Sequence, residues 1–79
     1  MQLNVLLFAS YAEALGAPSV ALTLSDGASV EDVLSAVRAM APGYGLPPAL
    51  VAVNQEYASP RQMLSEGDEV AIIPPVAGG

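Results

Sequence analysis

The sequence predicts an α+β fold in which a mixed, twisted β-sheet packs on one main α-helix. Short apolar runs at 3–8, 20–24, 50–53 and 70–73 have the length and the β-branched content of strands. One longer segment, 29–41, carries apolar residues at helical spacing. Because a chain of 79 residues can enclose only one modest core, we expect a single domain of residues 1–74 and a flexible tail of residues 75–79.

The first predicted strand, 3–8, is expected to have one buried and one less buried face. Alternation divides its residues into two sets, Leu3, Val5 and Leu7 on one face and Asn4, Leu6 and Phe8 on the other. Because the second set contains Asn4, we expect that face to be the less buried one. Phe8 should therefore be partly exposed.

A short helical turn is expected next, over residues 10–15. Ser10 is the predicted N-cap because Glu13 follows three residues later, and Gly16 with Pro18 should end the helix. A second strand at 20–24, with its apolar residues in phase, completes this part of the sequence before a turn at 26–27.

The main helix is expected over 29–41. Its apolar residues recur at helical spacing and are Val30, Val33, Leu34, Val37 and Met40. Ser29 and Asp32 form a capping-box pattern at its start, and Pro42-Gly43 should end it. We interpret its apolar face as core, because so short a chain needs one amphipathic helix to cover its sheet.

The remaining strands lie in the last third of the sequence. A strand at 50–53 leads into a turn at Asn54-Gln55, after which Tyr57 and Ala58 return as a short pairing segment. The last strand, 70–73, is apolar on both faces, so it is either central or carries an exposed apolar patch. This order of elements is typical of the β-grasp, or ubiquitin-like, architecture.

Composition excludes many kinds of active site. The sequence has no cysteine and no histidine, which removes thiolate nucleophiles, disulfides, imidazole bases and the usual zinc ligands, so we expect no metal site. Eight acidic residues face two arginines, and the net charge of -6 argues against nucleic-acid binding. A basic protein partner and simple solubility explain this charge equally well.

Two further features of composition bear on location and reactivity. The sequence has neither a secretory signal pattern nor an apolar run near the roughly 18 residues that a membrane span needs, so we expect a soluble, cytoplasmic protein that binds no membrane. The sequence also has no lysine. An activated C-terminal carboxyl could otherwise be lost to an amine of a neighbouring copy, although compositional drift explains the absence equally well.

The last two residues, Gly78 and Gly79, follow a stiff Pro74-Pro75 step, and we expect no further domain after them. Glycine has no Cβ, so a Gly-Gly end can enter a channel too narrow for other residues. The terminal carboxylate is therefore the first candidate for the reacting group. From Pro74 onward, an extended tail would span about 20 Å.

The whole chain resembles one protein family, and three stretches of the sequence are the most specific parts of this resemblance. They are the strand-to-turn step at 53–55, the segment 64–71, and the tail 74–79 with its Pro-Pro and Gly-Gly pairs. Together they identify the chain as similar to the small sulfur-carrying subunit of molybdopterin synthase, the MoaD family of ubiquitin-like proteins. One departure is Ala77, where the family often has Ser or Thr.

The resemblance implies a non-catalytic sulfur-donor subunit of a sulfurtransferase complex. An adenylyltransferase similar to ubiquitin-activating enzymes would use ATP and magnesium to adenylate Gly79, and a sulfur donor protein would supply the sulfur of a C-terminal thiocarboxylate. Gly79, with Gly78, would then enter the large subunit and donate sulfur to cyclic pyranopterin monophosphate. The chain itself would bind no cofactor, and the complex would be a heterotetramer of two copies of each subunit.

The predicted docking surface is apolar and lies near the root of the tail. It consists of Phe8, Tyr57 and Ile73, followed by the stalk Pro74 and Pro75 and by Val76 and Ala77 at the mouth of the partner's channel. Alternation along their strands places Phe8 and Ile73 on the outward face of the sheet. The competing interpretation is that each residue simply occupies an ordinary, partly buried position in the sheet.

Three other functions remain open at the level of sequence. The chain could carry sulfur for thiamine synthesis or for transfer-RNA thiolation, although the turn at 54–55 and the stalk at 74–76 favour the molybdopterin type. It could also be a protein modifier joined to lysines as ubiquitin is, or a plain interaction domain whose tail is incidental.

Overall fold

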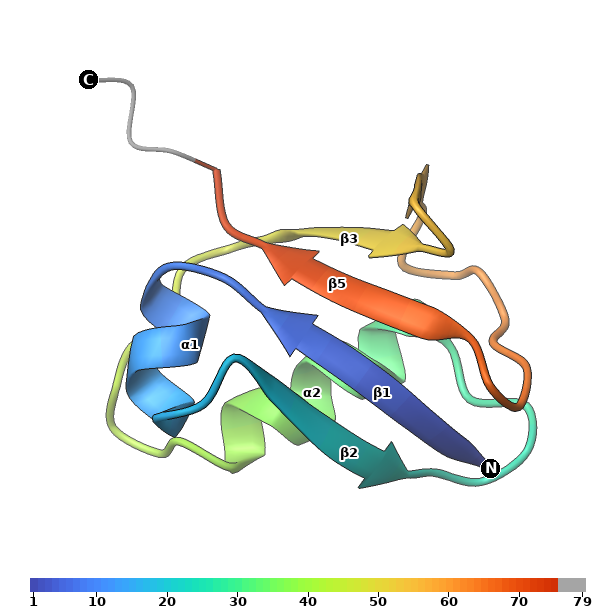
Figure 1. The fold of residues 1–79 in the computed structure, drawn as a ribbon, viewed down its shortest axis with the longest axis horizontal. Coiled ribbons are helices and arrows are strands. Elements are labelled where there is room, and N and C mark those ends of the chain that lie inside the picture. The colour runs from blue at the N-terminus through green and yellow to red at the C-terminus, as the bar shows by residue number, and fades with distance from the viewer. Residues whose placement is uncertain (76–79) are drawn as a thin grey trace.

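A mixed sheet forms the frame of the molecule in this computed structural model, which describes residues 1–75. Its strands within that range are β1 (Gln2–Leu7), β2 (Ser19–Thr23), β3 (Leu50–Val53), β4 (Glu56–Ala58) and β5 (Glu69–Ile73), in the spatial order β2-β1-β5-β3-β4. β1 and β5 run parallel, and the other neighbouring strands run antiparallel (Figure 1). The predicted α+β class and β-grasp arrangement are confirmed.

The helix α2 (Val30–Ala39) crosses one face of this sheet (Figure 1). Its start is as predicted, because the Asp32 N–H donates to Ser29 Oγ and the Ser29 N–H donates to Asp32 Oδ2 at 2.9 Å. Met40 does not belong to the buried stripe, contrary to the expectation. The helix ends at Ala39, and Met40 at the C-cap position is 50% exposed.

The hydrophobic core lies between α2 and the inner face of the sheet. The fully buried side chains of the described residues are Val5, Val30, Val33, Val37, Val70, Ile72 and Tyr11. The Tyr11 hydroxyl donates to the carbonyl oxygen of Pro47 and accepts from Arg38 Nη2 at 3.4 Å, so its buried polar atom is satisfied. The predicted inward phase of the first strand is confirmed.

The short helix α1 (Ser10–Leu15) links β1 to β2 and begins differently from the prediction. The N-cap position is Ala9 rather than Ser10, and no side chain caps the helix. Ala9 takes φ +51° and ψ −124°, a sharp reversal that lets the chain leave the strand and enter the helix directly. Gly16, in the left-handed conformation, ends the helix as predicted. Neither helix within residues 1–75 is long and apolar enough to cross a bilayer.

Candidate functional site

The root of the tail lies at the end of the central strand. β5 pairs with β1 on one side and with β3 on the other, so the chain leaves the middle of the sheet at Ile73. Pro74 is buried and Pro75 is exposed. Val76, Ala77, Gly78 and Gly79 lie outside the described residues, and the predicted division between a domain and a tail stays a prediction.

The sheet face opposite α2 is hollowed beside this root. The pairing register aligns Leu6 with Ala71, Ala71 with Ala52, and Ala52 with Tyr57, so one row of outward side chains crosses four strands. Two small alanines occupy the middle of the row, whereas larger side chains stand at its ends. The result is a groove of about 330 Å³.

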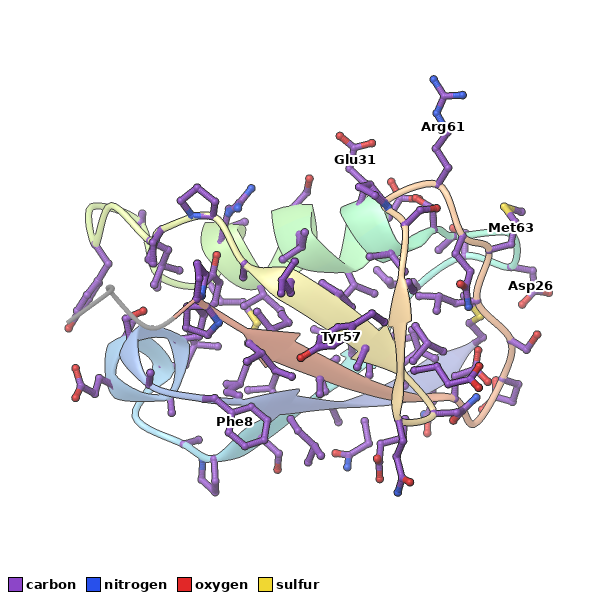
Figure 2. The ribbon with its side chains drawn as sticks, turned by 90° about the horizontal axis from the view of Figure 1, so that it is seen from above. Phe8, Asp26, Glu31, Tyr57, Arg61 and Met63 are labelled. Carbon is purple, nitrogen blue, oxygen red and sulfur yellow. The ribbon has the colours of Figure 1, made fainter. Side chains whose placement is uncertain are left out.

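The groove brings together the three residues predicted to form the docking surface. Its lining residues are Leu6, Phe8, Ala52, Gln55, Tyr57, Glu69, Ala71 and Ile73. Phe8 is 45% exposed and Tyr57 is 72% exposed, so both aromatic side chains present a large surface beside the groove. Phe8 projects on the side of the sheet away from α2 (Figure 2). Phe8, Tyr57 and Ile73 therefore share one surface, and their role in binding stays a prediction.

Five lining residues of this groove were not predicted: Leu6, Ala52 and Ala71, which form its floor, and Gln55 and Glu69 at one end. Leu6 and Ala71 belong to the outward phases that alternation already gave, so the signal for them was present. Ala52 could be assigned to the groove only once β3 was placed beside β5, because that pairing brings it next to Ala71. Gln55 and Glu69 are polar, and no apolar pattern points to them.

The turn from β3 to β4 is tied to the start of β5 by side-chain hydrogen bonds. Asn54 Nδ2 donates to Asp68 Oδ1 at 3.0 Å, and the Glu69 N–H donates to Asn54 Oδ1 at 3.0 Å. Asp68 Oδ2 accepts from the Ser65 N–H at 2.8 Å. These bonds to the charged form, first that from Ser65 and then that from Asn54, hold the pKa of the Asp68 carboxyl below its ordinary value. The resembling stretches 53–55 and 64–71 thus meet as one structural brace.

The electrostatics of the groove are simple. Among its described lining residues, Glu69 alone is charged. Within residues 1–75, no group of three or more acidic, histidine or cysteine side chains is placed to hold a metal ion. An exposed apolar hollow of this kind is suited to receiving side chains of another molecule.

Comparisons with known proteins give this geometry its context. Residues 5–79 match the model of the ThiS family. The molybdopterin synthase sulfur carrier subunit of Chlamydomonas reinhardtii is 42% identical over 83 residues, covering all of both chains. The structure of SAMP1, the small archaeal modifier protein 1 of Haloferax volcanii, is 30% identical, with a TM-score of 0.84 over the whole of both chains.

A more distant structure contains a partner. It is the complex of subunits 1 and 2 of molybdopterin-converting factor from Helicobacter pylori, with a TM-score of 0.67 over the whole of both chains compared. At 17% identity this likeness shows the fold alone. The family model and the algal relative both extend over essentially the full sequence, and so the chain belongs to the ThiS family, as a relative of the molybdopterin synthase sulfur carrier subunits.

Proposed function

We propose that this chain is the sulfur carrier for molybdopterin synthase, acting in molybdenum cofactor biosynthesis. The observation that carries the proposal is the exposed apolar groove beside the point where the tail leaves β5. A carrier needs both a surface that docks on its partner and a terminal group that reaches the partner's active site. The relationship to named sulfur carrier subunits supports the same role.

The proposed chemistry begins at the carboxylate of Gly79. A carboxylate is a poor electrophile, so an adenylyltransferase joins it to the AMP part of ATP, with magnesium, and releases pyrophosphate. Sulfur at the sulfide level, supplied by a donor protein, then attacks the acyl carbon, and AMP leaves as the thiocarboxylate forms. Because the sequence has no cysteine, the terminal carboxyl group is the place in this chain for a covalently carried sulfur.

Sulfur transfer follows in the large subunit. The thiocarboxylate sulfur forms a bond to a carbon of cyclic pyranopterin monophosphate and displaces an oxygen substituent from that carbon. Water then hydrolyses the resulting thioester, which leaves the sulfur on the pterin and returns Gly79 as a carboxylate. Two carriers in succession supply the two sulfurs of the dithiolene. The catalytic side chains belong to the large subunit, while Gly78 and Gly79 of this chain deliver the reacting atom.

The groove is the proposed docking surface for the large subunit. Phe8, Tyr57 and Ile73 would insert against apolar residues of the partner, and Val76 and Ala77 would line the mouth of its channel. Burying exposed aromatic side chains contributes most to affinity in interfaces of this kind. The stalk at Pro74 and Pro75 reduces the conformational entropy lost on insertion. The assembly, two copies of each subunit, would operate in the cytoplasm.

The intact mass of the thiocarboxylated protein tests this function. We expect the thiocarboxylate to revert to the carboxylate only when the large subunit and cyclic pyranopterin monophosphate are both present. A matched control lacks Gly78 and Gly79 and should accept no sulfur. If the thiocarboxylate persists beside a large subunit that is active with another carrier, the chain belongs to a different sulfur pathway, such as thiamine synthesis or transfer-RNA thiolation.

A second candidate function is covalent protein modification. It is favoured by the 30% identity to a structure named as an archaeal modifier protein. In that case the activated Gly79 would form an amide with lysines of other proteins. Adducts in cell extracts that survive thiol reductants and disappear when Gly79 is deleted would support modification, whereas their absence during active cofactor synthesis would reject it.

A further inference from the structure

Backbone strain in the described residues is concentrated at the edges of the groove. Within residues 1–75, positive φ angles at residues other than glycine occur at Ala9, Asn54 and Gln55. Ala9 directly follows the groove residue Phe8, and Gln55 lines the groove itself. Such conformations destabilise the folded state, and they persist where the surrounding structure or a function requires them.

The first two strained residues have a local structural reason. Ala9 makes the reversal into α1, and its carbonyl oxygen accepts a hydrogen bond from the Glu13 N–H at 3.0 Å. Asn54 is a residue type that tolerates the left-handed region, and its side chain bonds to Asp68 and to the Glu69 N–H. In both cases contacts within the chain compensate for the strain.

Within residues 1–75, no comparable side-chain contact compensates for the backbone strain at Gln55. It occupies the second position of the two-residue turn between β3 and β4, with φ +71°, where glycine is the favoured residue. Glutamine has no special tolerance of this conformation, and its side-chain amide makes no hydrogen bond within the described residues. Glycine at this position would give the same turn with less strain.

The side chain of Gln55 faces the docking surface. It lines the groove with Tyr57 and Glu69, next to the exposed apolar residues. We infer that Gln55 is a binding residue whose side-chain amide forms a hydrogen bond with the large subunit at the edge of the groove. This inference rests on the proposed function, because it assumes that the large subunit covers this face.

The chemistry of the contact follows from the neighbours of Gln55. Glu69 is the charged lining residue of the groove, and its carboxylate oxygens are hydrogen-bond acceptors. The part of the large subunit that covers Gln55 and Glu69 should therefore present N–H or O–H donors, and the part above Ala52 and Ala71 should present an apolar side chain that fills the hollow. Glutamine at position 55 thus lowers the stability of the free carrier and contributes polar contact in the complex.

Two substitutions separate the side chain from the backbone strain. Gln55→Gly removes both the amide and the strain, whereas Gln55→Ala removes the amide and keeps the strain. We expect the melting temperature of Gln55→Gly to rise by about 4 °C, the shift expected when strain of this kind is relieved in a small domain. Gln55→Ala should melt close to the unchanged protein.

Binding to the purified large subunit, measured by isothermal titration calorimetry, gives the second readout. Both variants should bind about fivefold more weakly, the effect of one lost hydrogen bond. Opposite changes in stability and affinity for Gln55→Gly would separate a binding role from a structural one. Unchanged affinity of both variants would overturn the inference, and so would weaker binding by the glycine variant alone, since this would implicate turn rigidity instead of the amide.

Ile73→Asp serves as the reference variant in the same titration. If it binds weakly while both Gln55 variants bind normally, the docking surface stands and the inference about Gln55 fails. If Ile73→Asp also binds as the unchanged protein does, the large subunit does not use this groove, and the docking part of the proposed function fails with it.

Discussion

The two faces of the central strand β5 differ in what their apolar residues do. Ile72 points inward and is fully buried against the core, whereas its neighbour Ile73 points outward and lines the groove. The inner face is filled by interlocking branched side chains, and the outer face is left hollow at Ala52 and Ala71. Two isoleucines that are adjacent in the sequence therefore have different environments: Ile72 contributes to the core, whereas Ile73 lines the groove that we propose for recognition.

The contrast between the two faces raises the question of why apolar side chains occupy positions where folding does not require them. Exposed apolar side chains gain little from folding, since their surface remains in contact with water. A monomeric chain has no energetic reason to place Phe8 and Tyr57 beside the same hollow. Their arrangement fits the proposed docking surface, because aromatic residues beside a recess are typical of the centre of an interface.

Truncating the two isoleucines is the strongest test of this contrast. Ile72→Ala should lower the free energy of unfolding by about 3 kcal/mol, because it removes buried surface and leaves a cavity in the core. Ile73→Ala should lower it by less than about 1 kcal/mol, because the groove already admits water there. Urea unfolding followed by circular dichroism measures both values. Equal losses for the two variants would show that the outer face also supports the fold.

Placing a charge in the groove tests recognition separately from folding. Phe8→Asp should weaken binding to the large subunit on the order of a hundredfold, because the complex would bury an unpaired carboxylate in place of an aromatic ring. The melting temperature should change much less than it does in Ile72→Ala, because Phe8 is 45% exposed in the free protein. Surface plasmon resonance with the immobilised large subunit measures the affinity.

Met63→Asp is the matched control for this experiment. Met63 is also an exposed apolar residue, 62% accessible, but it lies outside the groove and away from Phe8 (Figure 2). Its substitution should leave the affinity unchanged. Equal weakening by both variants would indicate a general effect of added negative charge, on a protein whose net charge is already -6, rather than contact at the groove.

The brace between the turn and β5 should have a smaller effect on stability. Asn54→Ala removes two side-chain hydrogen bonds and places alanine at a positive φ, which should cost about 1.5 kcal/mol of unfolding free energy. Asn54→Gly loses the same bonds but tolerates the backbone conformation, so it should be the more stable of the two by about 0.5 kcal/mol. Urea unfolding measures both. A larger loss in the glycine variant would show that the turn contains no strain.

Much of the fold could be predicted because its main signals are local. The alternation of Leu3 and Val5, the capping pair of Ser29 and Asp32, and the left-handed Gly16 each act over a few residues, and each is found where the sequence placed it. The start of α1 was missed because Ala9 adopts a conformation that alanine rarely takes. No propensity points to such a residue.

The site could be predicted only in part, because the groove depends on contacts between distant residues. Outward phase and proximity to the tail were enough to select Phe8 and Ile73. The floor needed the parallel pairing of β1 with β5 and the pairing of β3 with β5, which align Leu6, Ala71 and Ala52 in one row. Alanine in a strand has no pattern that marks it as the floor of a groove, so its importance appears only when larger neighbours surround it.

The pH dependence of the brace provides the smallest and most specific test. The pKa of Asp68 is lowered from 3.8 in the folded state by its bonds to the Ser65 N–H and to Asn54, so the folded protein favours the carboxylate more than the unfolded chain does. This contribution to stability is therefore fully present above the unfolded value of 3.8 and is lost as the pH falls through the folded value.

Asp68→Asn lacks the titrating group, so the difference in unfolding free energy between the two proteins should be larger at about pH 6 than at about pH 2.5. Both proteins share the seven other acidic residues, so this difference isolates Asp68. A difference that stays constant with pH would mean that the hydrogen bonds from Ser65 and Asn54 do not favour the charged carboxylate. The brace would then depend on its geometry and not on the charge of Asp68.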